Sequence, residues 1–326
     1  MSLTEDWQLP PELRPRQSGL QFDLETAYRS VVQLHTEASE DGYTASILGT
    51  ERLGSGVMIR SAERKLILTI GYLIMEAESI WLTDCDGSVV EAYPLAFDQV
   101  SGLGLVQPLG TLDVPALERG SASTLTIGDR VLVIGHGGAR HSLEAHLIAR
   151  REFAGYWEYL LDEALFTAPP HPQWGGTALV TPDGLLVGVG SLFVQESLAR
   201  ESFDANMFVP VDLLEPVLQD MIELGQPRRT PRPWLGIYTA EQSDQVVVAG
   251  LTRGGPAHRA GLRLGDVILE VAGQSVRSLP QFLRGIWSAG AAGAEVPLTL
   301  GRGRESVRLL VHSASRDDFL KKPMRH

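Results

Sequence analysis

The sequence has 326 residues, of which 44% are hydrophobic and 21% are charged, and its formal net charge is −12. A chain of this length is long enough for about two domains of ~100–200 residues each, and its composition is that of an ordinary globular protein. The diffuse negative charge argues against nucleic acid or an anionic membrane as a partner. No apolar run is long enough for a transmembrane helix.

The N-terminal residues 1–11 contain neither a basic segment nor an apolar core, so they do not resemble a secretory signal. Taken as it stands, this beginning indicates a cytoplasmic protein, or one from which a signal has been removed. The single cysteine, Cys85, excludes an intrachain disulfide but does not identify the compartment.

The first two thirds of the chain are predicted to be mainly β. Residues 1–24 are rich in Pro, Arg and Gln and are predicted to form an extended arm, and a short helix over Leu24–Arg29 follows. From there to Leu192, short β-rich runs alternate with Gly, Asp and Pro, which is typical of an all-β barrel or sandwich. The β-rich runs include Ser30–His35, Gly54–Arg60, Lys65–Thr69, Ser79–Thr83, Gly104–Pro108, Arg130–Gly135 and Leu185–Val189.

A domain boundary is predicted after residue 225. Apolar residues at helical spacing predict a helix over Asp212–Leu224, and Gly225 is expected to end it. The next eight residues, Gln226–Pro233, contain three prolines and three arginines and are expected to form a stiff, exposed linker.

A second unit is predicted over residues 234–315, with a frayed basic tail over 316–326. It is expected to be a small α+β domain in which helices at Pro256–Leu262 and Leu279–Ser288 accompany the strands. The predicted strands are Val246–Ala249, Gly265–Val271, Val296–Leu300 and Ser306–Val311.

Four segments are more specific than composition: Gly54–Val57, Leu125–Gly135, Met207–Val211 and Gly255–Leu269. They resemble motifs of the trypsin-like HtrA/Deg (DegP-like) serine protease family with one C-terminal PDZ domain. The resemblance extends from about residue 25 to residue 312. It implies a trypsin-like double six-stranded β-barrel over 25–225 and a PDZ domain over 234–315. It also implies a homo-trimer, or a hetero-oligomer with active relatives, and a periplasmic or cell-envelope location.

The catalytic triad of that family is expected to be degenerate here. A trypsin-like enzyme needs a Ser nucleophile, a His base and an Asp that orients the His. In the segments that resemble the family's motifs, Tyr72 stands at the His position, Gly102 at the Asp position and Gly175 at the Ser position. Tyrosine, with an ordinary pKa of ~10, is a poor proton acceptor at neutral pH.

This expectation does not depend on the details of the alignment. No His lies between His35 and His136, and no Ser lies between Ser142 and Ser191. A slip of one residue would place Trp174, which has no hydroxyl, at the nucleophile position. The family's oxyanion-hole glycine is replaced by Gln173, which restricts the backbone of that loop.

Other side chains could replace the missing triad or bind a metal ion. Thr177 and His171 could form an unconventional nucleophile–base pair; otherwise Thr177 fills a strand end and His171 faces solvent in a Pro-rich loop. His136, His141 and His146 are spaced five apart, which is not the close spacing that zinc sites favour. The sequence therefore predicts no metal site and no cofactor.

The second unit is expected to retain peptide binding. A PDZ domain takes an extended peptide as an added strand and holds its terminal carboxylate in a nest of backbone N–H groups. The expected nest is Trp234–Ile237, where Gly236 permits the turn of the backbone. Leu235, Ile237, Phe282 and Ile286 are expected to line the pocket for the last side chain, or else to form only the domain core.

Three functional hypotheses remain open. The leading one is a non-catalytic scaffold or chaperone-like adaptor that binds C-terminal or extended peptide segments of other proteins. The alternative is a serine-type endopeptidase of protein quality control with an unrecognised nucleophile. The third is a holdase-type chaperone. Trp174 either blocks the former active-site cleft or anchors a partner there.

Overall fold

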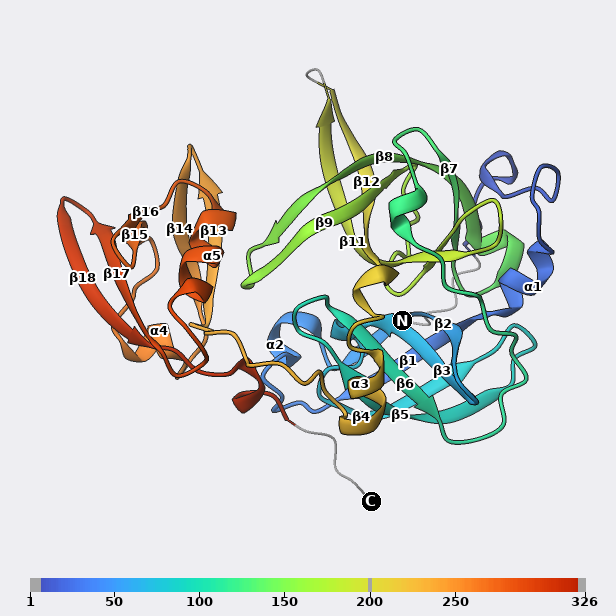
Figure 1. Cartoon of the computed structure of the whole chain (residues 1–326), viewed down its shortest axis with the longest axis horizontal. Helices are drawn as coiled ribbons and strands as arrows, with labels where there is room; N and C mark the ends of the chain where they lie inside the picture. The colour runs from blue at the N-terminus through green and yellow to red at the C-terminus, as the bar shows by residue number, and fades with distance from the viewer. Residues whose placement is uncertain (1–6, 199–200, 322–326) are drawn as a thin grey trace. The chain divides into compact units, whose positions relative to one another are not determined.

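A computed structural model describes residues 7–198 and 201–321. These residues form two compact units (Figure 1). The described residues of unit 1 are those up to Arg151, those of Glu163–Arg228, and Lys321; unit 2 consists of Glu152–Asp162 and Arg229–Leu320. A short stretch from the middle of the chain therefore belongs to the C-terminal unit.

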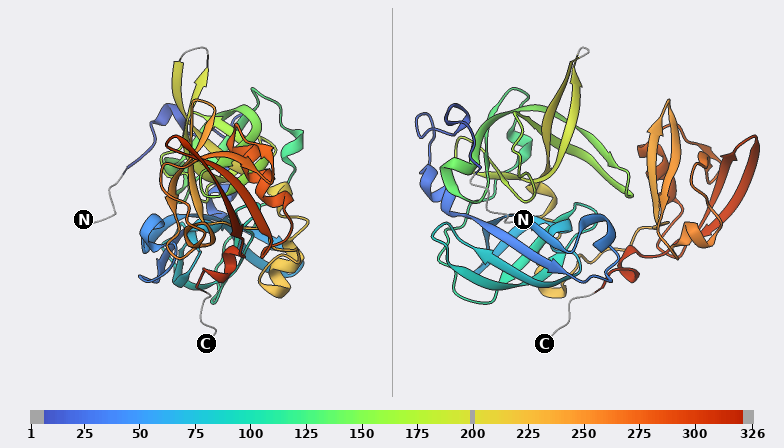
Figure 2. Two further views of the ribbon diagram at one scale, coloured as in Figure 1. Left: turned by 90° about the vertical axis from the view of Figure 1, so that its left-hand side faces the viewer. Right: turned by 180° about the vertical axis from the view of Figure 1, so that it is seen from behind.

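In the described part of unit 1, the strands close into two six-stranded barrels that lie side by side (Figures 1 and 2). The first barrel has the order β1-β2-β3-β6-β5-β4 and the second the order β10-β11-β12-β9-β8-β7. The first barrel comprises β1 (Val31–Ala38), β2 (Glu51–Ser61), β3 (Arg64–Ile70), β4 (Ala77–Thr83), β5 (Val89–Phe97) and β6 (Leu103–Pro108). The second comprises β7 (Arg130–Ile134), β8 (Ser142–Gly155), β9 (Tyr159–Ala168), β10 (Ala178–Val180), β11 (Leu186–Leu198) and β12 (Glu201–Pro210). The predicted mainly β chain with a double six-stranded barrel is confirmed.

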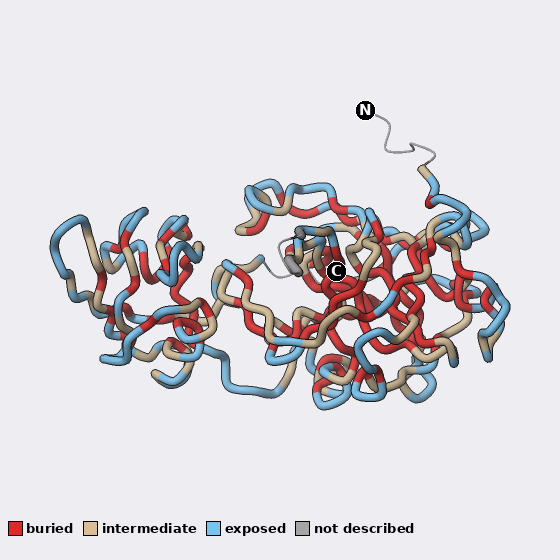
Figure 3. Tube along the Cα trace, turned by 90° about the horizontal axis from the view of Figure 1, so that it is seen from above, coloured by how far each residue is buried: buried red, intermediate tan, exposed pale blue. Residues whose placement is uncertain are grey.

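Many residues of the barrel strands in unit 1 are buried (Figure 3). In β3, every residue from Leu66 to Ile70 is buried. The second barrel is filled by residues such as Val133, Leu165 and Phe208, all fully buried. Continuous apolar runs suit strands that are covered on both faces.

In unit 1, a capping side chain begins one short helix and a glycine ends another. In α1 (Leu24–Arg29), the Asp23 side chain accepts hydrogen bonds from the N–H groups of Glu25 and Thr26. Gly225, at φ 75°, ends α3 (Leu218–Leu224). The remaining short elements are α2 (Ala45–Leu48) and the 3₁₀ turns η1 (Pro11–Leu13), η2 (Gly71–Leu73), η3 (Ala122–Thr124) and η4 (Gly138–His141). Among the helices of the described ranges, none is both long and apolar enough to span a membrane.

The helix predicted over Asp212–Leu224 was too long. The structure has a 3₁₀ turn, η5 (Val211–Leu213), and α3 begins only at Leu218. Pro216 lies between them, and a proline inside a helix lacks the N–H donor and crowds the preceding turn. The apolar spacing alone did not reveal this interruption.

Two segments predicted to be loose are packed. The arm is not simply extended, because Trp7 stacks on His141 with ring centroids 4.5 Å apart and Leu9 is buried in the second barrel. In the predicted tail, η6 (Arg316–Asp318) is followed by Phe319, whose ring lies 4.7 Å from that of Trp234. Apolar side chains within these polar segments explain their packing. The prediction of fraying for 322–326 lies outside the described residues.

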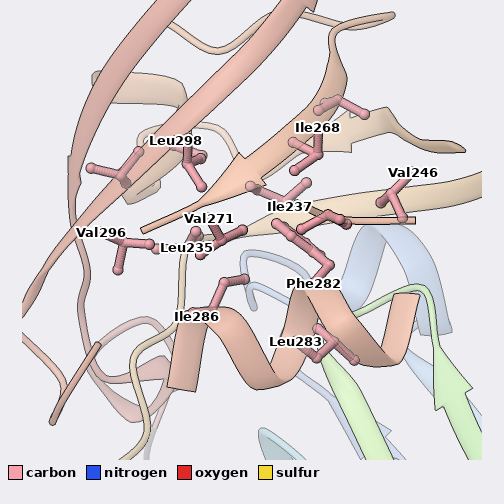
Figure 4. Packing of buried hydrophobic residues seen from close by; sticks show 14 of the residues in the cluster. Leu235, Ile237, Val246, Ile268, Val271, Phe282, Leu283, Ile286, Val296 and Leu298 are labelled. Atoms are coloured by element: carbon pink, nitrogen blue, oxygen red, sulfur yellow. The ribbon is translucent and has the colours of Figure 1, made fainter. Parts of the chain in front are cut away.

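Unit 2 is built on one antiparallel sheet. Its described strands follow the order β13-β14-β15-β17-β18, and β16 pairs with β15, so β13 lies at an edge. The strands are β13 (Ile237–Gln242), β14 (Gln245–Leu251), β15 (Val267–Val271), β16 (Gln274–Ser275), β17 (Glu295–Arg302) and β18 (Glu305–His312), accompanied by α4 (Pro256–Arg259) and α5 (Leu279–Ser288). Phe282, Leu283 and Ile286 of α5 lie beneath the sheet and complete the core (Figure 4).

Candidate functional site

The residues at positions 72 and 102 lie at the same end of the first barrel, on two different connections. Tyr72 lies in η2, directly after β3, and Gly102 lies just before β6. The N–H of Gly71 donates to the carbonyl of Gly102 at 2.6 Å. Gly102 has φ 81°, a backbone conformation that glycine adopts without strain.

Gly175, on a loop of the second barrel, lies directly beside Tyr72. A β-carbon added to Gly175 would lie 2.8 Å from the Tyr72 hydroxyl. That hydroxyl donates a hydrogen bond to the carbonyl of Ser191 at 2.9 Å. The space that a side chain at position 175 would need is thus occupied by a phenol.

The electrostatic environment keeps this phenol protonated. Burial raises the pKa of Tyr72 far above its usual range, while a hydrogen bond with the Trp174 side chain acts in the opposite direction. A neutral phenol that donates its proton to a carbonyl can position a neighbouring group but is a poor general base. The Trp174 ring also lies against Phe193, with centroids 5.5 Å apart.

A buried network holds the turn that carries Tyr72. The Arg52 guanidinium donates to the carbonyls of Tyr72 and Met75 at 2.8 and 2.7 Å and to the Thr44 hydroxyl at 2.8 Å. The Glu76 carboxylate accepts from the N–H and hydroxyl of Thr44 and from the N–H of Lys321. Arg52 and Glu76 are only 4% and 6% exposed. Sequence analysis missed this network, although a charged residue within a β-rich segment is the kind of signal that could have indicated it.

The loop before Gly175 is fastened by His171. This residue is 1% exposed, so the expectation that it faces solvent was wrong. Its Nε2 lies 2.8 Å from the carbonyl of His141, and its Nδ1 lies 3.1 Å from the N–H of Gln173. Nδ1 therefore accepts from Gln173 while Nε2–H donates to His141. Burial lowers the pKa of His171, which favours this neutral form.

These contacts concern the two remaining catalytic features of the loop, an oxyanion hole at Gln173 and a nucleophile–base pair of Thr177 and His171. The Gln173 N–H is directed to His171, whereas an oxyanion hole needs an N–H aimed at the reacting carbonyl. Thr177 is fully buried, and its hydroxyl donates to the carbonyl of Trp174 at 2.9 Å. Thr177 and His171 each bond to backbone groups in this arrangement.

The rings of two of the three spaced histidines, His136 and His141, bond to backbone carbonyls. His136 Nε2 lies 3.4 Å from the carbonyl of Asp84. His141 contacts the carbonyls of His136 and Trp7 through its two ring nitrogens. Within residues 7–198 and 201–321, no group of three or more His, Cys, Asp or Glu side chains is arranged to hold a metal ion.

In unit 2, three successive backbone N–H groups converge on one carboxylate, that of Glu158. Gly236 and Ile237 donate to its Oε1 at 2.6 and 2.9 Å, and Leu235 donates to its Oε2 at 3.0 Å. Gly236 has φ 75°, and a β-carbon there would lie 3.0 Å from both Thr252 and Trp234. This position therefore needs glycine for both conformation and space.

The other residues predicted for this site lie around the nest. Trp234 is not one of its donors, because its N–H pairs with the carbonyl of Ala314. Leu235, Ile237, Phe282 and Ile286 are all buried in the core of unit 2 (Figure 4). Glu158 was not predicted, because it is separated from the nest by more than 75 residues and belongs to no motif.

Comparison with known proteins agrees with this architecture. Residues 54–189 match the family model for a trypsin-like peptidase domain, and residues 233–312 match that for a PDZ domain. The chain is therefore a trypsin-like peptidase domain joined to a PDZ domain. Curated relatives with similar sequences include serine endoproteases named DegP-like and DegS.

Two curated relatives illustrate the extent of the similarity. A probable periplasmic serine endoprotease, DegP-like, of Pseudomonas fulva is 27% identical over 241 residues, which cover 69% of this chain and 48% of the relative. The serine endoprotease DegS of Haemophilus influenzae is 24% identical over 249 residues, 72% of this chain and 70% of the relative. The chain thus spans about half the length of the DegP-like relative.

Solved structures share the fold. The HtrA-type protease AlgW with decapeptide superposes with a TM-score of 0.54 at 23% identity, covering 92% of this chain and 98% of that one. A serine endoprotease from Yersinia pestis gives a TM-score of 0.53 at 23% identity, covering 90% and 96%. At this level of identity the similarity concerns the fold alone.

Proposed function

We propose that this HtrA-like chain binds peptide segments of other proteins through its PDZ domain and does not cleave them by a Ser–His–Asp triad. The observation that carries the proposal is the contact between positions 72 and 175. In place of a base facing a nucleophile, a protonated phenol faces a glycine and donates to the Ser191 carbonyl. Gly175 has no side chain that could attack a carbonyl carbon, and a protonated phenol is a poor acceptor for a nucleophile's proton.

Peptide binding is supported by the three N–H groups of Leu235–Ile237. They are directed at a carboxylate in unit 2, and backbone nests of this kind hold the terminal carboxylate of a peptide. The strand β13 lies at the edge of its sheet, where a ligand strand can add.

The proposal is tested with the purified full chain. We expect neither labelling by a fluorophosphonate probe, which reacts with activated serine hydroxyls, nor release of fluorescence from quenched, unfolded casein. Trypsin serves as the positive control, and the assay is repeated with a pool of C-terminal peptides. Specific cleavage by a preparation free of other proteases would contradict the proposal, and Thr177 and His171 would then be the first residues to substitute.

Location and assembly complete the proposal. Because the DegP-like relatives are described as periplasmic, we place this chain in the same compartment. We also propose assembly into a homo-trimer or a hetero-oligomer with active relatives. Fractionation of cells that express the natural gene, followed by light scattering on the purified complex, tests both statements.

A further inference from the structure

The carboxylate seated in the nest of unit 2 comes from the chain itself. Glu158 lies at the tip of the hairpin between β8 and β9. This tip, Glu152–Asp162, belongs to the same compact unit as the nest. The side-chain carboxylate accepts from all three N–H groups that we assign to a peptide C-terminus, at 2.6–3.0 Å.

The hairpin also makes the backbone contact expected of a bound peptide. Two residues before Glu158, the carbonyl of Tyr156 accepts from the N–H of Thr239 at 3.0 Å. Thr239 lies two residues beyond Ile237 on the edge strand β13. Backbone bonds between antiparallel strands recur every second residue. Tyr156 and Glu158 therefore stand in the register of a ligand strand whose last residue occupies the nest.

Side chains of the hairpin extend this contact. Leu160 is 7% exposed and belongs to the same buried cluster as Phe282 and Ile286. Arg284 of α5 forms ion pairs with Glu152 and with Asp162, one on each strand of the hairpin. The ion pairs are exposed and contribute little by themselves, whereas the burial of Leu160 is typical of a docked side chain.

Contacts within the tip determine its backbone conformation. Glu158 has φ 60°, a left-handed conformation that residues with a side chain seldom adopt and that glycine or asparagine would adopt more readily. Trp157 stacks on Tyr159 with centroids 5.7 Å apart and lies against Gly155, where a β-carbon would be 2.8 Å from its ring. An unfavourable backbone conformation is retained where surrounding contacts determine it.

We propose that the hairpin tip, Tyr156–Leu160, is an internal ligand of the PDZ domain, and that its Glu158 side chain takes the place of a peptide C-terminus. The inference rests on the proposed peptide-binding function and adds its regulation. A peptide with a free terminal carboxylate then binds only to domains that the hairpin has left. Its apparent affinity is reduced by the fraction of such domains.

The acidities of the two carboxylates favour replacement of Glu158 by the terminal carboxylate of a peptide. Burial raises the pKa of Glu158 to about 7, although the three N–H donors act to lower it. A terminal α-carboxyl has an ordinary pKa of ~3.3–3.7, so it stays ionised more readily in the same surroundings. The external ligand is therefore the better anion for this nest.

The test compares the full wild-type chain with Glu158→Ala, Glu158→Gln and the control Glu305→Gln, which alters an exposed glutamate on β18. The probe is a pool of fluorescein-labelled heptapeptides with apolar last residues and free C-termini; the same peptides as C-terminal amides serve as the reference. Polarisation reports binding. Hydrogen exchange of the amides of residues 235–239, without peptide, reports whether the nest is covered.

We expect Glu158→Ala to increase hydrogen exchange at these amides. It should also bind the free-carboxylate peptides at least about tenfold more tightly than wild type and Glu305→Gln do, because a nest that Glu158 occupies in ~90% of the molecules leaves only about a tenth of them open to peptide. Glu158→Gln is expected to give a smaller change in the same direction. Unchanged exchange in β14 and β17 would verify that the domain remains folded.

The two hypotheses fail in different ways. Equal affinity and equal exchange in Glu158→Ala and wild type would overturn the internal ligand and leave peptide binding standing. Faster hydrogen exchange in Glu158→Ala, with neither the free-carboxylate nor the amidated peptides bound by any variant, would support the contact of Glu158 with the nest and overturn the proposed peptide-binding function.

Discussion

The triple variant Tyr72→His/Gly102→Asp/Gly175→Ser is expected to cleave unfolded casein, which the wild-type chain is expected to leave intact. The structure brings these three positions together, with a β-carbon at 175 only 2.8 Å from the Tyr72 hydroxyl. Loss of a whole triad reduces kcat by about 10⁶-fold in a comparable protease. Even an imperfectly aligned triad should therefore raise the cleavage rate by roughly 10³-fold.

Partial variants separate chemistry from packing. Gly175→Ser alone is expected to destabilise unit 1 by about 1–3 kcal/mol, because the new side chain overlaps the phenol. Tyr72→His in the same chain should remove most of this loss, and this coupling can be measured by a double-mutant cycle. Tyr72→His/Gly102→Asp without the serine is the inactive control.

The incomplete oxyanion hole is expected to limit the cleavage rate of the triple variant. The Gln173 N–H is engaged by His171, and removal of one oxyanion donor costs about 10²–10³-fold in kcat. Gln173→Gly keeps this N–H but lets the backbone turn it toward the cleft more freely, so adding this change to the triple variant is expected to raise the rate further. A folded quadruple variant without activity would contradict the view that the barrels preserve a disarmed active site.

The variant Glu76→Gln is expected to lower the free energy of unfolding of unit 1 by about 3 kcal/mol, because hydrogen bonds to a charged group contribute about 1.5–3 kcal/mol each. The carboxylate accepts from Tyr43, Thr44 and Lys321 in a site only 6% exposed. An amide would direct its NH₂ group at some of these donors. Calorimetry should show a decrease of roughly 6–12 °C in the Tm of unit 1.

The pH dependence of this loss follows from the pKa of Glu76. Burial acts to raise this pKa, but hydrogen bonds from the N–H of Lys321, from the hydroxyl and N–H of Thr44 and from the N–H of Tyr43 lower it overall. A carboxyl whose folded pKa is depressed stabilises the protein above its ordinary pKa and loses that contribution as the pH falls through the folded value. The difference between wild type and Glu76→Gln is therefore expected to be full at pH 7 and to shrink below about pH 4.5.

Glu78→Gln is the matched control, since Glu78 is an exposed glutamate two residues further along the chain. It should leave the Tm unchanged. A Glu76→Gln variant as stable as wild type would show that the network around Arg52 does not hold the Tyr72 turn.

Local signals in the sequence were enough to predict several elements and the architecture. The helices Leu24–Arg29 and Leu279–Ser288 were predicted with the bounds that the structure has. Each begins after a residue, Asp23 or Ser278, whose side chain bonds to the first turn. Short β-rich runs indicated a β-barrel or sandwich, and the double six-stranded barrel was implied by the resemblance of specific motifs to the HtrA/Deg family. These features depend on neighbours within a few residues.

The composition of the candidate site was also contained in the sequence, since the residues at positions 72, 102 and 175 could be named without coordinates. Their proximity could not, because Tyr72 and its acceptor Ser191 are 119 residues apart. The burial of His171 and the docking of Trp7 likewise depend on partners that are distant along the chain.

Glu158 is the clearest example of a contact that the sequence did not indicate. Its surroundings in the sequence are those of an ordinary hairpin, and nothing near it indicates an anion site. Its partners lie 77–79 residues away. Hydrogen bonds between such distant groups form only after the chain has closed large loops, and no local preference encodes that closure. The sequence therefore indicated the backbone turn at Gly236, whereas the tertiary structure decided which N–H groups converge there and which carboxylate they bind.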